Sequence, residues 1–216
     1  MYPLQKLLLG IFTATVIPAC LHADVKLTIQ AMERTQAWAG SFGGGGLSIN
    51  PAAKSENLIA SKIDPGSGLA QSFKGDGKKL KAVGFYFSST AAPAPDKKYK
   101  IALLDFGTSG PVNDSDKFNG DAKLVFSEDY TWEATRSGQA YLFEFSGASN
   151  VILDSTHYYA IALDFTDASG GNNIIRSSND PYSDGRLAVG TQSKFQLKFA
   201  GGDRDADFVV YTAEDK

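Results

Sequence analysis

The sequence predicts an all-β protein, an antiparallel two-sheet β-sandwich similar to a jelly roll. Most apolar segments after residue 24 are short, rich in β-branched and aromatic residues, and bounded by Gly, Pro, Asn, Asp or Ser. This is the pattern of antiparallel strands joined by turns. About a dozen such segments suit a sandwich, and none of the links between them resembles a βαβ crossover.

The predicted strands follow one another along the whole of this region. They span residues 25–31, 69–75, 79–89, 99–107, 122–128, 139–147, 151–155, 157–165, 172–178, 186–190, 194–200 and 207–213. Residues 28–40 also fit the 3.6-residue period of a short helix, so strand and helix both stay open there. The glycine-rich segments 42–48 and 167–173 are predicted to be turns, because glycine tolerates positive φ angles.

Alternation within the predicted strands indicates which side chains are buried, because successive side chains of a strand point to opposite faces. In the strand at 157–165, the core face is predicted to carry Tyr159, Ile161, Leu163 and Phe165. The opposite face carries Tyr158, Ala160, Ala162 and Asp164. In the strand at 79–89, the buried residues are predicted to be Val83, Phe85 and Phe87.

Length and composition predict one folded domain over residues 24–216. The chain has 216 residues, of which 43% are hydrophobic, and this is enough apolar material for a core. The formal net charge is -3, with acidic and basic residues interspersed. Because no dense Lys/Arg block is present to neutralise phosphates, nucleic acid is not expected as a partner.

The N-terminal residues 1–23 have the features of a secretory signal peptide. Lys6 precedes an apolar stretch at 7–19, and the small residue Ala23 marks the expected cleavage site. The protein is therefore expected to be secreted or at the cell surface. Cys20, the one cysteine, lies in a segment similar to a lipoprotein box, so membrane anchoring by lipidation of Cys20 is the alternative to its removal. Cleavage after Ala23 would leave no disulfide.

The sequence lacks the residues that several kinds of catalysis require. After the leader, His157 is the one histidine, and it is predicted to lie at a strand end. One histidine without a cysteine does not form a zinc shell, and a catalytic triad would depend on His157 alone. Paired carboxylates, as in glycoside hydrolysis, stay open because Asp and Glu occur throughout the chain.

Calcium is the cofactor that the sequence allows. Asp203, Asp205 and Asp207 alternate in the segment DRDAD, and Ca²⁺ prefers such oxygen ligands. Phe208 stands where an EF-hand loop needs glycine, so a site at a strand edge is the form expected. A second acidic loop, at 113–121, contains Asp114, Asp116, Asn119 and Asp121. The alternative for both segments is a solvated turn.

The loop at 177–186 is the candidate ligand-binding segment. Its donors and acceptors are Asn179, Asp180, Asp184 and Arg186, with Tyr182 between two turns. Sugar recognition needs planar polar groups together with an aromatic face, which Tyr182 would supply, with further faces from Trp132, Trp38 and Tyr130. The alternative is that the loop only turns the chain, with Arg186 paired to an acid on a neighbouring strand.

The order of segments also resembles a known family. The segments LAQSF, KAVGFYFSS, YKIALLDFG, FEFSGASNVILDSTHYYAIALDF, SSNDPYSDGRLAVG and ADFVVYT are similar to those of secreted bacterial choice-of-anchor domains, over about residues 58–212. These domains look like carbohydrate-binding jelly rolls. The resemblance implies an exported sandwich, and it implies location and fold more directly than a ligand.

Three functions follow from these observations. The leading hypothesis is a non-enzymatic secreted or cell-surface module that binds polysaccharide, and it predicts an exposed aromatic beside clustered polar groups. The second is a structural or adhesive protein that packs against other envelope components, with both tryptophans buried and no concave polar groove. The third is a polysaccharide-active enzyme, which needs two acids facing a cleft, one of them with a raised pKa.

Overall fold

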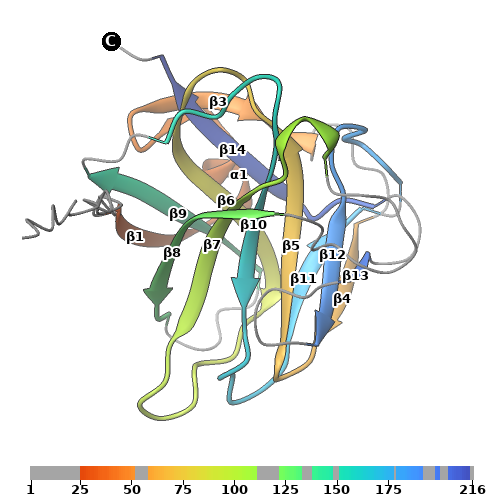
Figure 1. The fold of residues 1–216 in the computed structure, drawn as a ribbon. Helices are drawn as coiled ribbons and strands as arrows, with labels where there is room; N and C mark the ends of the chain where they lie inside the picture. Colours follow the sequence, from red (N-terminus) through yellow and green to blue (C-terminus); the bar gives the residue numbers. More distant parts are fainter. Residues whose placement is uncertain are drawn as a thin grey trace, which may run out of the picture.

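The protein consists of two antiparallel β-sheets packed face to face, as the sequence predicts (Figure 1). The computed structural model describes residues 25–51, 58–110, 122–132, 138–147, 151–177, 179–191, 198–199 and 204–214. The predicted leader, residues 1–23, lies outside these ranges, as does Asp203. Among the described residues, no helix is long and apolar enough to cross a membrane.

The larger sheet, called sheet A, has the strand order β1-β9-β6-β14-β3-β2, and β11 pairs with both β6 and β4. Its strands are β1 (Val25–Met32), β2 (Ser41–Phe42), β3 (Gly45–Ile49), β4 (Ile59–Ile63), β6 (Lys79–Ser89), β9 (Gln139–Gly147), β11 (Asn172–Arg176) and β14 (Phe208–Ala213). The central strands β6 and β14 are rich in aromatic and β-branched residues, which favour an extended backbone.

The smaller sheet, sheet B, has the order β13-β12-β5-β10-β7-β8. Its strands are β5 (Ser67–Lys74), β7 (Tyr99–Asp105), β8 (Lys123–Tyr130), β10 (Tyr158–Asp164), β12 (Leu187–Thr191) and β13 (Lys198–Phe199). A short 3₁₀ helix, η2 (Gly107–Ser109), follows β7. The central strand β10 pairs with β5 on one side and with β7 on the other.

The main core lies between the sheets and is strongly aromatic. The inward face of β10 carries Tyr159, Ile161 and Leu163, followed by Phe165, and all four are at most 3% exposed. Val83, Phe85 and Phe87 of β6 are likewise buried in this core. The alternation in the sequence therefore identified the buried faces of both strands correctly.

A second, smaller core covers the outer face of sheet A. The helix α1 (Arg34–Ala37) packs there, and Trp38 beside it lies over Gly84 of β6. Asp207 fixes this helix, because it accepts hydrogen bonds from Arg34 Nε at 2.5 Å and from Trp38 Nε1 at 2.9 Å. Residues 28–40 therefore contain both predicted structures: a strand that ends at Met32, followed by one turn of helix.

Three local predictions differ from the structure. Residues 151–155 form no strand, and only Ile152 makes an isolated bridge with Lys79. The segment 42–48 turns at Gly43 and Gly44, both with positive φ, but its second half is strand β3. Strand β4 was not predicted, because its sequence IASKI places Ser61 and Lys62 side by side and shows no alternation of apolar and polar residues.

Candidate functional site

A cavity of about 270 Å³ opens where the loop after residue 182 meets sheet B. We call it the loop pocket. It is lined by Ser72 of β5, Ser109 and Gly110 at η2, Tyr158 of β10, and Ser183, Asp184, Gly185 and Arg186 of the loop. Two members of the predicted ligand-binding set, Asp184 and Arg186, therefore lie in one cavity with several hydroxyl groups.

The loop is fastened to β5 around Ser72. The backbone N–H of Arg186 donates to Ser72 Oγ at 2.8 Å, and the N–H of Ser72 donates to the Arg186 carbonyl at 3.0 Å. Gly185 allows the loop to lie this close to β5, because any side chain at this position would place its Cβ atom 2.0 Å from the Ser72 carbonyl oxygen. Only glycine fits at this close approach.

Tyr182 is partly buried, and its ring packs against the core beside the loop. Its ring packs edge-on against Phe208 with centroids 6.0 Å apart, and its hydroxyl accepts a hydrogen bond from the Lys74 N–H at 3.1 Å. Burial raises the pKa of Tyr182 to about 12. The structure thus places this predicted ligand residue under the loop pocket, as a support for its wall.

Asp205 is the buried anchor of the same loop. Its side chain is fully buried, and it accepts hydrogen bonds from Gln71 Nε2 at 2.7 Å and from the Tyr182 N–H at 3.0 Å. Burial, helped by the nearby Asp180 carboxyl and opposed by the two hydrogen-bond donors, raises the pKa of Asp205 to about 7. Asp205 therefore holds together β5, the loop and the segment before β14.

The remaining predicted loop residues lie at its start. Asp180 is exposed, and its carboxyl lies close enough to Asp205 to raise the pKa of that residue. The carbonyl of Asn179 accepts a hydrogen bond from Ser177 Oγ at 2.7 Å. Neither residue is among the described residues that line the loop pocket. The structure thus divides the predicted set into pocket residues and residues that shape the turn.

Tyr158 is the aromatic residue of the loop pocket, and the sequence analysis did not select it as a site residue. Its ring is partly exposed, Lys74 Nζ lies 5.8 Å from the ring centroid, and Gly110 packs against the ring. One signal was present in the sequence. The alternation of residues 157–165 placed Tyr158 on the face opposite the core, where a tyrosine is accessible to a ligand.

The aromatic residues that were expected to stack on a ligand are buried. Trp132 is 7% exposed, Trp38 is 9% exposed and Tyr130 is 4% exposed. The Trp132 ring packs against Tyr141, Phe87 and other core rings, and its Nε1 donates to the Ala91 carbonyl at 3.0 Å. A ring in this environment stabilises the core and has no free face for a sugar. This burial argues against Trp132 as a ligand residue, and its place at a ligand site stays a prediction.

The described aspartates of the predicted metal site do not fit calcium binding. Asp205 and Asp207 are both fully buried, and each carboxylate already accepts hydrogen bonds from two separate residues. Burial raises the pKa of Asp207 as well, although Arg34 opposes this shift. Within the described ranges, no three His, Cys, Asp or Glu side chains are grouped as metal ligands. The acidic loop at 113–121 lies outside these ranges.

His157 lies at a strand end, as predicted, and contacts Asp105 at the end of β7. Its Nδ1 lies 3.1 Å from both carboxylate oxygens of Asp105. The Asp105 Oδ1 also accepts a hydrogen bond from the Gly107 N–H at 2.8 Å. The His157–Asp105 contact therefore joins the end of β7 to the start of β10.

No protein-family model matches the chain, and no curated protein matches its sequence.

Proposed function

We propose that this protein is a non-enzymatic secreted or cell-surface module that binds polysaccharide in the loop pocket. The observation that carries the proposal is the grouping of Tyr158, Asp184 and Arg186 with three serines in one cavity. A carboxylate, a guanidinium and hydroxyls match the hydroxyl groups of a sugar, and a tyrosine edge offers an apolar surface. The cavity volume of about 270 Å³ suits one or two sugar units of a longer chain.

The loop pocket is preorganised, which supports a binding role. Gly185, Ser72 and the buried Asp205 hold the loop in one conformation before any ligand arrives. A rigid site loses less conformational entropy on binding than a mobile one. The resemblance to exported jelly-roll domains agrees with the same role and with a location outside the cytoplasm.

The two alternative functions are each favoured by one observation. The burial of Trp38 and Trp132 is what a structural or adhesive protein would show, although a concave polar pocket is not expected of such a protein. The raised pKa of Asp205 meets one requirement of a carboxylate enzyme. However, Asp205 is fully buried, and Asp184 is the carboxylate among the described residues that line the loop pocket. These facts favour binding over hydrolysis.

The test is depletion of purified residues 24–216 from solution by a panel of insoluble polysaccharides, with and without a calcium chelator. Retention on at least one polysaccharide supports the proposal. Retention on none of them overturns it, and release of soluble sugar would favour the enzyme. The variants Asp184→Asn and Arg186→Gln should each weaken retention about tenfold or more, because each removes a charged hydrogen-bonding group.

The matched control is Asp64→Asn. Asp64 is an exposed acid paired with Lys62 in the turn before β5, and it does not line the loop pocket. This variant makes the same chemical change and should bind like the unchanged protein. Equal loss in Asp64→Asn and Asp184→Asn would show that retention depends on net charge and not on the loop pocket.

A further inference from the structure

We propose that Arg176 and Arg204 together bind a sulfate or phosphate group. We call these two residues the arginine pair. Arg176 is the last residue of β11, and Arg204 lies in the segment that leads into β14. Neither residue is among the described residues that line the loop pocket. The arginine pair is therefore a separate site, and its test does not depend on polysaccharide binding.

The end of β11 brings the two arginines close together. Arg176 forms an isolated antiparallel bridge with Ala206, and the Ser177 N–H donates to the Asp205 carbonyl at 3.0 Å. Arg204 precedes Ala206 by two residues, so it lies diagonally across from Arg176. Diagonal neighbours on paired segments are within reach of each other when their side chains are long. Both arginines are partly buried.

The guanidinium of Arg176 is held in place with donors to spare. Its Nε donates to the Ser61 hydroxyl of β4, and its Nη1 donates to the Ser177 carbonyl at 3.2 Å. A guanidinium has five N–H donors, so these two bonds fix the plane of the group without using all of its donors. The donors on Nη2 have no partner within the described part of the chain. They can point at an oxyanion.

The arginine pair brings two positive charges together without a described carboxylate between them. Arg204 has no side-chain hydrogen bond or ion pair among the described residues. Burial, helped by the nearby Arg204 guanidinium, lowers the pKa of Arg176. Both effects disfavour the charged form of Arg176, and an anion bound between the guanidinium groups would offset both. The fold therefore holds together two like charges that an anion would stabilise.

The acids next to Arg204 in sequence are engaged elsewhere. The Asp205 carboxylate accepts hydrogen bonds from Gln71 and from the Tyr182 N–H, at 2.7 and 3.0 Å. Asp207 is paired with Arg34 on the outer face of sheet A. Both carboxylates are fully buried in these contacts. They do not neutralise the arginine pair in the way that a bound anion would.

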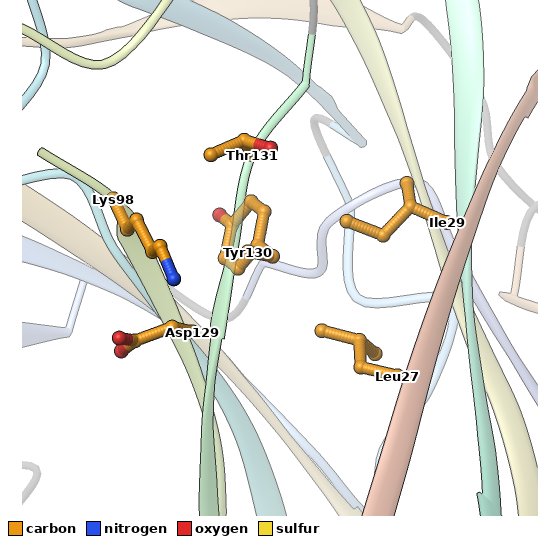
Figure 2. Close-up of a pocket in the computed structure, with 6 residues that line it drawn as sticks. All are labelled: Leu27, Ile29, Lys98, Asp129, Tyr130 and Thr131. Atoms are coloured by element: carbon orange, nitrogen blue, oxygen red, sulfur yellow. The ribbon is translucent and has the colours of Figure 1, made fainter. Parts of the chain in front are cut away.

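A second cavity of the structure lacks this imbalance of charge. It has a volume of about 310 Å³ and is lined by Leu27, Ile29, Lys98, Asp129, Tyr130 and Thr131. Figure 2 shows Lys98 and Asp129 on the same side of Tyr130. Because a cation and a carboxylate both border this cavity, it does not select an anion. The arginine pair is the better candidate for an anion site.

The chemistry of two guanidinium groups selects a ligand with several oxygens. Each planar guanidinium can donate two parallel N–H groups to an oxyanion, and sulfate and phosphate offer enough oxygens for both. A free inorganic anion and a sulfate ester of a polysaccharide present the same oxygens. The test below separates these two sources.

The test is an NMR titration of the purified chain with sodium sulfate at constant ionic strength. We expect saturable shifts of the amide signals of residues 59–61, 175–177 and 204–206. Arg204→Gln should weaken sulfate binding about tenfold or more, because it removes one of two charged donor groups. Arg176→Lys keeps the charge but loses the planar fork, and it should weaken binding about threefold or more.

The source of the anion follows from competition with two polymers. Displacement of sulfate by dextran sulfate, but not by dextran, would support the site and identify a sulfate ester as a ligand. Binding of free sulfate without displacement by dextran sulfate would support the site and identify the inorganic anion. Neither result requires that the loop pocket bind any polysaccharide.

The control is Lys97→Gln, which removes one positive charge at an exposed position before β7. This variant should bind sulfate like the unchanged protein, and Arg204→Gln should unfold at no lower temperature than the unchanged protein. The proposal is wrong if sulfate gives no saturable shifts at these residues, or if Arg204→Gln binds it equally well. Equal weakening in Lys97→Gln and Arg204→Gln would mean an adventitious ion only, attracted by net charge, and would also overturn the proposal.

Discussion

Gln71 and Asp205 form a reciprocal clamp between β5 and the segment before β14. The Gln71 Nε2 donates to Asp205 Oδ1 at 2.7 Å, and the Gln71 Oε1 accepts from the Ala206 N–H at 2.8 Å. Both side chains are fully buried. Since Asp205 also binds the Tyr182 N–H, this clamp joins the core of the sandwich to the wall of the loop pocket.

Replacing Gln71 should destabilise the protein strongly. The variant Gln71→Leu leaves the buried Ala206 N–H and one oxygen of Asp205 without partners, so the free energy of unfolding should fall by about 2–4 kcal/mol. Urea denaturation measures this change. Gln30→Leu, the same substitution at an exposed position of β1, should change the free energy of unfolding by less than about 0.5 kcal/mol. Similar effects in both variants would contradict the clamp.

Stability should decrease as the pH rises toward neutrality. The pKa of Asp205 is raised from 3.8 to about 7 in the folded protein, so the folded state binds more protons than the unfolded state between these values. The contribution of Asp205 is therefore fully present below about pH 4 and is lost as the pH rises through about pH 7. Thermal unfolding measured between about pH 4 and pH 7 gives the change of stability with pH, and this change should be smaller in Asp205→Asn. An unchanged slope in that variant would assign the pH dependence to other groups.

A methyl group at residue 185 should open the loop pocket. Gly185→Ala places a Cβ against the Ser72 carbonyl, so the loop must move away from β5, and stability should fall by about 1–3 kcal/mol. Polysaccharide retention should fall as well. The control is Gly46→Ala on β3, where a Cβ meets no atom within 4 Å. If Gly185→Ala kept both stability and retention, the close approach to Ser72 would not hold the loop.

Trp132 should matter for stability and not for ligand binding. Trp132→Phe removes the hydrogen bond to Ala91 and part of the ring packing, and it should lower the free energy of unfolding by about 1–3 kcal/mol. Retention on the bound polysaccharide, measured below the unfolding temperature, should be unchanged. A selective loss of retention would restore Trp132 to the ligand site.

Calcium should have little effect on thermal unfolding. Asp205 and Asp207 are already bound to Gln71, Tyr182, Arg34 and Trp38, so calcium would have to displace these groups. A calorimetric scan in millimolar calcium and one in chelator should therefore give the same midpoint. A clear rise with calcium would indicate a site that uses residues outside the described ranges, such as Asp203 or the loop at 113–121.

The fold was predictable because it depends on patterns within single strands. The alternation of β6 and β10 identified their buried faces, and the turns followed from glycine and aspartate. The site was only partly predictable, because it depends on contacts between distant segments. Asp184 and Arg186 were found in their loop, but Tyr158 joins them through the pairing of β10 with β5. The burial of Trp132 likewise depends on rings from β6, β7 and β9.

The position of β14 has a consequence for the timing of folding. This strand lies between β6 and β3 in sheet A, although it is formed by residues 208–213. The register of β6 with β14 joins residues more than a hundred positions apart, and such distant pairings form slowly. Sheet A cannot be completed before its last segment has been synthesised. The nascent chain therefore has an incomplete sheet A until residues 208–213 have left the ribosome.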